Sequence, residues 1–137
     1  MVAYSFKAQF AEPIVNGEKC QTVRGARKRH AREGEAIQLY TAMRTKHCRK
    51  LIAPDPICVD VRPIKIGIGS RDPRIITGME IDGVELDDVE IEAFAVADGF
   101  GSELVKGFAR RRMGEFWVQN YEWNKFIGVV IRWRPSR

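Results

Sequence analysis

The stretch Gly17-Glu18-Lys19-Cys20-Gln21-Thr22-Val23-Arg24 joins a turn to an extended run that brings a lysine, a threonine and an arginine close together. Side chains alternate along a strand, so Lys19 should face one way and Thr22 and Arg24 the other, unless a bulge brings them together. A lysine desolvated beside other cations loses its proton more easily, as a base that activates the Thr22 hydroxyl must do. The same pattern also fits a polar edge strand without a chemical role.

The residues on either side of this stretch predict strands and a short helix. Apolar and polar residues alternate over 4–10, which is typical of a strand with one buried face. Residues 12–17 predict one or two helical turns, with proline in the first turn and glycine at the end. A basic loop is expected over 25–35, followed by a strand over 36–40.

The second half of the chain predicts a long strand followed by a hairpin. Residues 57–68 are rich in β-branched side chains and contain Pro63, which indicates a strand that bends at the proline. Asp82-Gly83 lies between two short apolar runs, at 79–81 and 84–86. This dipeptide is the strongest short-range signal for a tight hairpin.

Two helices and a last strand complete the predicted order. Asp88 is expected to cap the first helix and Ser102 the second. Their expected buried side chains are Val89, Ile91, Phe94 and Ala97 in the first, and Leu104, Phe108, Phe116 and Trp117 in the second. With a strand over 126–133, the order predicts an α+β fold, a small β-barrel with short helices at its ends, as a single domain over 1–137.

Composition points to an ordinary globular domain. The 137 residues are 45% apolar and 30% charged, which suits one domain with one compact core. No apolar run approaches the roughly 20 residues that cross a bilayer, and residues 1–7 lack the layout of a signal peptide. The three cysteines lack the spacing of a disulfide framework, so reduced thiols and a cytoplasmic location are expected.

Charge is unevenly distributed along the chain, whose formal net charge is +5. A basic run holds Arg24, Arg27, Lys28, Arg29, Arg32, Arg44, Lys46, Arg49 and Lys50, opposed only by Glu33 and Glu35. Residues 80–103 are acidic and contain no lysine or arginine. One side of the protein should therefore attract polyanions, although two solvated faces would give the same pattern.

A second polar cluster falls at Asp98-Gly99-Phe100, at the expected break between the two helices. Asp98 could act as an acid or hold a lysine there, or it could simply cap a helix. Among the histidines and cysteines only His47 and Cys48 are close in sequence, and as neighbours on a strand they point apart. Neither a metal nor another cofactor is expected.

The chain resembles the ASCH domain family along nearly its whole length. The motif Gly17-x-Lys19-x-x-Thr22-x-Arg24 is moderately specific, and its combination with the later motifs makes the resemblance fairly strong. The other matching residues are Phe6, Phe10, Ile14, Gly34, Leu39-Tyr40, Asp98-Gly99-Phe100, Phe116-Trp117 and Gly128-x-x-Ile131-x-Trp133. The resemblance implies a β-barrel related to the PUA fold, with a cleft proposed to bind RNA.

The family resemblance also implies two kinds of activity. Some members hydrolyse N4-acetylcytidine with a lysine, a threonine and a glutamate, and at least one has been described as a ribonuclease. Lys19 and Thr22 match the first two of these residues. Asp98 stands where the amidohydrolase has its glutamate and is one methylene shorter, which is a departure from that pattern.

Two functional hypotheses follow. The first is a binding module for RNA or a modified nucleoside, with these contact residues: Arg24, Arg27, Lys28, Arg29, Tyr40, Arg44, Lys46 and Phe100. The second is a hydrolase in which Lys19 is the base, Thr22 the nucleophile or hydroxyl activator, Asp98 the proton donor and Arg24 the residue that orients the substrate. Both hypotheses place Lys19 at the rim of the barrel, where its replacement by alanine would leave thermal stability nearly unchanged.

Overall fold

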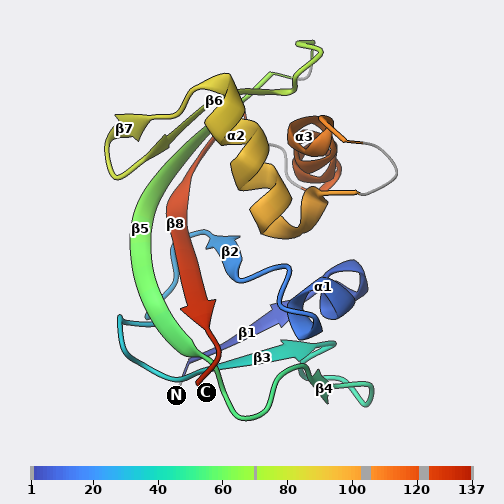
Figure 1. The fold of residues 1–137 in the computed structure, drawn as a ribbon, viewed down its shortest axis with the longest axis vertical. Coiled ribbons are helices and arrows are strands. Elements are labelled where there is room, and N and C mark those ends of the chain that lie inside the picture. Colours follow the sequence, from blue (N-terminus) through green and yellow to red (C-terminus); the bar gives the residue numbers. More distant parts are fainter. Residues whose placement is uncertain (1, 70, 103–105, 121–123, 137) are drawn as a thin grey trace. The chain divides into compact units, whose positions relative to one another are not determined.

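The structure, a computed structural model, describes residues 2–69, 71–102, 106–120 and 124–136. The chain divides into two compact units, which we treat separately. Unit 1 is Met1–Thr22, Arg27–Val61 and Ile131–Arg137, and unit 2 is Val23–Ala26 and Arg62–Val130. Two long strands, β5 (Ile57–Ile68) and β8 (Lys125–Arg134), contribute residues to both units (Figure 1).

The strands are hydrogen-bonded in two sheets. The first has the order β1-β3-β4, and the second has the order β2-β8-β5-β6-β7. Helices and strands are thus mixed along the chain, which confirms the α+β class. The bounds of the strands not yet given are β1 Val2–Phe6, β2 Gln21–Arg24, β3 Ile37–Thr41, β4 Arg49–Lys50, β6 Ile76–Ile81 and β7 Val84–Glu85.

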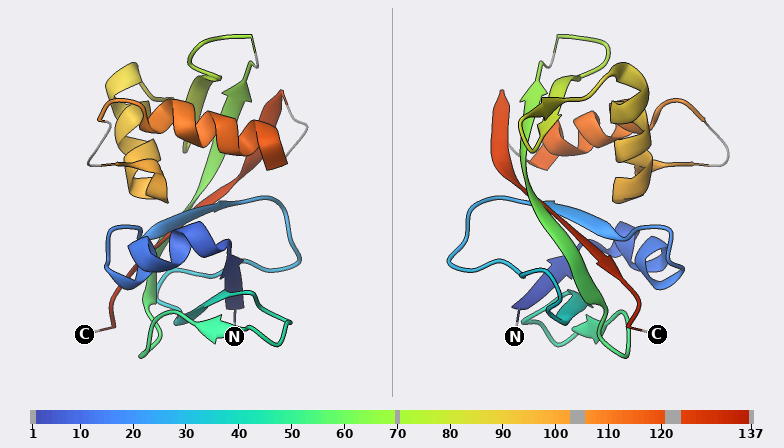
Figure 2. Two further views of the ribbon diagram at one scale, coloured as in Figure 1. Left: turned by 90° about the vertical axis from the view of Figure 1, so that its right-hand side faces the viewer. Right: turned by 60° about the vertical axis from the view of Figure 1, so that its left-hand side comes forward.

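In unit 1, β1 buries every second side chain, as its alternating sequence predicts, but it ends at Phe6 and not at residue 10 as expected. Val2, Tyr4 and Phe6 are buried, and β1 pairs with β3 in parallel, with Val2 opposite Ile37. The chain then enters a 3-10 turn, η1 (Ala8–Phe10), and the short helix α1 (Ala11–Val15), as Figure 2 shows. These two elements add Phe10 and Ile14 to the core of the unit.

The predicted strand over 57–68 and the hairpin after it are both present, but the register of β5 against β6 shifts between Gly67 and Ile68 and not at Pro63. The strand β5 has the bounds that the sequence predicts, and it pairs antiparallel with β6. Asp82 and Gly83 have φ values of 56° and 80° and join β6 to β7. Positive φ at both central positions is what a two-residue hairpin turn of this kind requires, and glycine adopts it without strain.

The first long helix, α2 (Asp88–Ala95), is capped one residue earlier than the sequence predicts. Asp87, not Asp88, is the N-cap: its carboxylate accepts the Glu90 N–H at 2.8 Å, and the Glu90 carboxylate accepts the Asp87 N–H at 3.0 Å. This reciprocal pair satisfies two amides at the helix start. The expected buried position of Val89 is wrong, because that side chain is 79% exposed.

The second long helix is α3 (Ala109–Asn120). Ser102, its expected cap, and Phe108, an expected helix residue, both precede it, so these two predictions are wrong. The Glu92 carboxylate of α2 instead accepts the N–H groups of Ala109 and Arg110, both at 3.0 Å. A side chain from a different helix therefore caps α3, beside which α2 lies in Figure 1. Phe108 is 53% exposed, and Leu104 falls outside the described residues.

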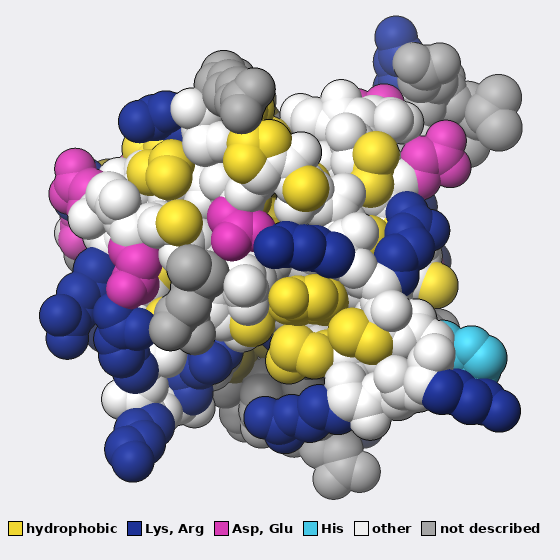
Figure 3. Space-filling view, turned by 90° about the horizontal axis from the view of Figure 1, so that it is seen from below, with side chains coloured by type: hydrophobic (Ala, Val, Ile, Leu, Met, Phe, Trp, Pro, Cys, Tyr) yellow, Lys and Arg dark blue, Asp and Glu magenta, His cyan; other side chains and the backbone are white. Residues whose placement is uncertain are grey.

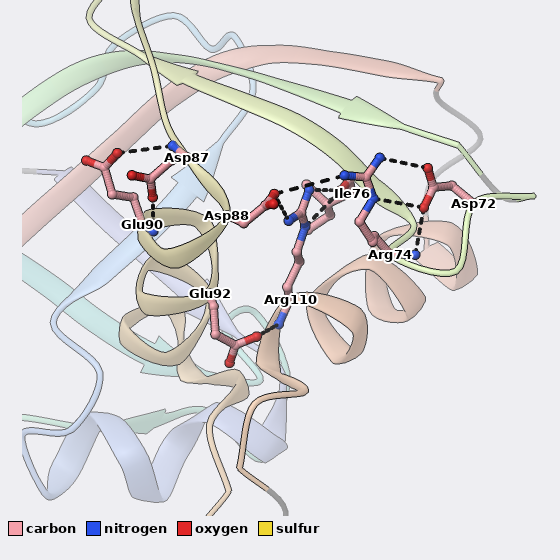
Figure 4. Close-up of polar contacts among 8 residues, drawn as sticks. All are labelled: Asp72, Arg74, Ile76, Asp87, Asp88, Glu90, Glu92 and Arg110. Atoms are coloured by element: carbon pink, nitrogen blue, oxygen red, sulfur yellow. Dashed lines mark hydrogen bonds and ion pairs between the residues drawn. The ribbon is translucent and has the colours of Figure 1, made fainter.

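Arg110 fastens α3 to the strand β6 and to α2 (Figure 4). Its side chain is buried and donates from two nitrogens to the Ile76 carbonyl, at 2.9 and 2.7 Å. A third nitrogen donates to the Asp88 carboxylate at 2.8 Å. Further along α3, Trp117 packs edge-on against Phe126 of β8, which confirms its expected place in the core.

Candidate nucleic-acid interface

Lys19 is positioned by the turn that ends α1. Gly17 has a φ of 78°, and the N–H groups of Glu18 and Lys19 both donate to the Pro13 carbonyl, at 2.9 and 3.0 Å. Glycine adopts this left-handed conformation without a Cβ clash, which lets the chain fold back on the helix. The turn thus places Lys19 directly before β2.

The Lys19 side chain is buried, which corrects the expectation that it lies at an exposed rim. It is 3% exposed, and its Nζ lies 4.8 Å from the Phe10 ring centroid and 5.9 Å from that of Phe6. A cation within about 6 Å of an aromatic face is attracted by the ring quadrupole. Burial raises the pKa of the neighbouring Cys20 thiol, and the Lys19 charge opposes that rise.

Thr22 and Gln21 are buried as well, at 4% and 5% exposure. β2 begins only at Gln21, so Lys19 lies outside the strand, and strict alternation does not apply to it. The Trp133 N–H of β8 donates to the Cys20 carbonyl at 3.0 Å, which fixes the chain between Lys19 and the strand. Unit 1 therefore holds both Lys19 and Thr22 in its interior.

The remaining predicted catalytic residue, Asp98, belongs to unit 2. It is 5% exposed and lies in the π-helical turn η2 (Val96–Phe100), beside Gly99 with a φ of 102°. Phe100, expected to contact a base, is buried and packs against Phe116 with ring centroids 5.4 Å apart. Arg24, at the end of β2, also belongs to unit 2.

A pocket of about 480 Å³ in unit 1 is lined by Val2 of β1 and by cations of the loop between β2 and β3. These cations are Arg27, Lys28, Arg29 and Arg32, and we call this feature the basic pocket. The sequence predicts the first three as RNA contacts. Arg32 was part of the basic run but not of that prediction, and only the folded loop shows that it lines the pocket.

The loop that carries these cations is tied to β1 through Tyr4. Arg27 donates to the Ala3 carbonyl at 3.3 Å, and its guanidinium carbon lies 5.0 Å from the Tyr4 ring centroid. The Tyr4 hydroxyl accepts the Ala31 N–H at 3.1 Å and lies 3.0 Å from His30 Nδ1. These contacts hold the basic loop against a strand of the core.

The cations of the basic pocket differ in their partners. Arg29 forms an ion pair with the Glu35 carboxylate, and this hydrogen bond is the main reason that the pKa of Glu35 is lowered. Within the described part of the chain, the Lys28 ammonium and the Arg32 guanidinium have no carboxylate partner. Lys28 and Arg32 thus form no ion pair among the described residues, although the Arg32 charge also helps to lower the pKa of Glu35.

The other predicted contacts in unit 1 lie on β3 and in the turn after it. Tyr40 is half-buried on β3 opposite Lys50, while Arg44 and Lys46 are exposed in the turn. None of these three lines the basic pocket. Figure 3 shows one face of the chain on which Lys and Arg side chains surround exposed apolar ones.

No family model, curated protein or solved structure matches the chain. No helix among the described residues is long and apolar enough to span a membrane. Across the same residues, no group of three or more histidine, cysteine, aspartate or glutamate side chains is arranged to hold a metal ion.

Proposed function

We propose that the chain is an ASCH-like domain of the PUA-like superfamily and that its unit 1 binds RNA or a modified nucleoside. The observation that carries this proposal is the basic pocket, where four cationic side chains of one loop line one depression. The β-barrel and the single domain over 1–137 remain part of the same proposal. The described strands are hydrogen-bonded in two separate sheets, and the chain divides into two compact units.

The charges of the pocket suit a phosphate backbone. Lys28 and Arg32 have no carboxylate partner among the described residues, so a phosphate would not have to displace an acid from them. Cations that neutralise phosphates release condensed counterions, which makes binding tighter at low salt. Such contacts hold the backbone without reading the base.

The buried face of β1 connects the basic pocket with the site of Lys19. Val2 lines the pocket, Tyr4 carries Arg27, and Phe6 contacts Lys19, all on one side of the strand. Four strand steps separate Val2 from Phe6, which is about 13 Å at roughly 3.3 Å per residue. A phosphate backbone held at the pocket would thus lie about 13 Å along β1 from Phe6, the ring beside the Lys19 ammonium.

The test is binding of a labelled single-stranded RNA over a series of salt concentrations. The affinity of the wild-type protein should fall as salt rises, and Lys28→Ala with Arg32→Ala should flatten the logarithmic salt slope by about 1.4, at about 0.7 per lost contact. Lys7→Ala with Arg71→Ala removes the same charge at exposed positions outside the pocket and outside the predicted contacts, so it is the matched control. Undetectable binding at low salt, or equal effects of the two double variants, would overturn the proposal.

A hydrolase is the second candidate, and one observation favours it: Lys19 and Thr22 are both buried within unit 1. Lys19 is removed from water and lies beside the Phe6 and Phe10 rings. In the proposed reaction the bond between N4 and the acetyl carbon of acetylcytidine breaks, and water supplies the oxygen of acetate and the proton of the cytidine amine.

Turnover is measured by incubating the protein with acetylated cytidine and following the release of cytidine. An RNA oligonucleotide in a parallel tube reports ribonuclease activity by its shortening. Lys19→Met keeps most of the side-chain volume and removes the amine, so it should abolish turnover. Absence of turnover by the wild-type protein, or equal turnover by Lys19→Met, would remove Lys19 from the catalytic role.

A further inference from the structure

One carboxylate, that of Glu35, is bonded to the cations of the basic pocket. One of its oxygens accepts from the Arg29 guanidinium, and the other accepts the Arg32 N–H at 3.2 Å. The side chains of Arg29 and Glu35 are 42% and 25% exposed, so the pair lies at the surface of unit 1. Any anion that enters the basic pocket therefore meets an arginine that is already paired.

Carboxylate and phosphate oxygens compete for an arginine because they make the same kind of bond. A guanidinium donates charge-assisted hydrogen bonds to either group with similar geometry. A phosphate that binds Arg29 must displace the Glu35 carboxylate or bind beside its negative charge. Lys28, which lines the same pocket, has no such competitor among the described residues.

We infer that Glu35 is a specificity-determining residue of the basic pocket, which withholds Arg29 from phosphate and leaves Lys28 and Arg32 as its main phosphate contacts. The inference depends on the proposed function and deepens it. By removing one phosphate contact, Glu35 lowers the part of the binding free energy that does not depend on sequence. Contacts with the nucleoside then contribute a larger share of the binding free energy. This is how a basic pocket gains selectivity without gaining a new contact.

The loop does not depend on the Glu35 carboxylate for its path. The Glu35 N–H donates to the Arg32 carbonyl at 3.0 Å, the Gly34 N–H donates to the Cys58 carbonyl at 2.8 Å, and the Cys58 N–H donates to the Glu35 carbonyl at 2.8 Å. Glu35→Gln leaves these backbone bonds intact and keeps a carbonyl oxygen for the Arg32 N–H. The variant therefore removes the charge and keeps the fold.

The experiment compares Glu35→Gln with Glu33→Gln in the same RNA-binding salt series. Glu33 is exposed on the same loop and has no hydrogen bond or ion pair with a described residue, so it is the matched control for net charge. Release of Arg29 should steepen the logarithmic salt slope of Glu35→Gln by about 0.7, which is about a two- to threefold larger loss of affinity over a fourfold rise in salt. Glu33→Gln should leave the slope nearly unchanged.

Arg29→Ala completes the design. In the wild-type background, Arg29→Ala should change RNA affinity less than Lys28→Ala does. In the Glu35→Gln background, Arg29→Ala should return the logarithmic salt slope to its wild-type value. If wild-type protein binds RNA but Glu35→Gln and Glu33→Gln behave alike, the inference is wrong and the proposed function stands. If wild-type protein does not bind RNA at all, the proposed function itself fails.

Discussion

Arg110 in unit 2 and the cations of the basic pocket in unit 1 represent two opposite uses of positive charge. Arg110 is 8% exposed, and three of its nitrogens donate to the Ile76 carbonyl and the Asp88 carboxylate. Lys28 and Arg32 are exposed and have no carboxylate partner among the residues that the structure describes. The same residue types thus hold one unit together and remain available to a ligand in the other.

The difference teaches that burial decides what a cation can do. A charge removed from water must be paired and hydrogen-bonded, which leaves Arg110 no capacity for a ligand. A solvated charge needs no partner in the protein, so it can exchange water and counterions for phosphate. Sequence shows Arg110-Arg111-Arg112 and the pocket cations as similar basic runs, and only the structure separates them.

The largest expected effect on stability comes from replacing the buried cation, Arg110. Arg110→Met should lower the free energy of unfolding by about 3 kcal/mol, because charge-assisted hydrogen bonds to the Ile76 carbonyl and Asp88 are lost. Arg111→Met is the control: Arg111 is exposed and, among the described residues, pairs only with Glu115, one turn along α3, so its loss should cost no more than about 0.5 kcal/mol. Denaturant unfolding of the two variants measures both values, and equal stabilities would contradict the structural role of Arg110.

Lys19 gives a smaller effect and sharpens the comparison, because it is a buried cation inside unit 1. Lys19→Ala should cost about 2 kcal/mol, since the ammonium loses its contacts with the Phe6 and Phe10 rings and the buried alkyl stem is removed. Thermal unfolding should show a lower midpoint for Lys19→Ala than for Lys19→Met, which retains the packing of the stem. An unchanged midpoint for Lys19→Ala would restore the expectation of an exposed rim lysine.

The smallest effect is expected from an ion pair at the surface of unit 2. Arg74 donates to Asp72 and lowers the pKa of that carboxyl from 3.8 to about 2. Because the folded-state pKa lies below the unfolded one, this pair stabilises the fold at pH values above about 4, and that contribution is lost as the pH falls toward about 2. Denaturant midpoints over this range should fall less steeply for Asp72→Asn than for wild type. Parallel pH profiles would show that the pair does not contribute.

The local elements of the fold were predictable because neighbouring residues determine them. Alternating side chains in β1, the β-branched run of β5 and the Asp82-Gly83 turn each carry their signal within a few residues. Helix starts were less predictable. The expected cap of α3 was Ser102, whereas the observed one is Glu92, a residue of another helix that no local pattern indicates.

By itself the sequence determined the α+β class, the basic character of the loop before β3 and the reactive residue types near Lys19, because composition and short-range periodicity are properties of the chain alone. Only the tertiary structure decided that Lys19 is buried, that Arg32 joins the pocket and that Glu35 neutralises Arg29. Burial and pairing depend on which distant segments pack together. A cation has the same charge in either case, but its surroundings decide whether that charge is used by the fold or offered to a ligand.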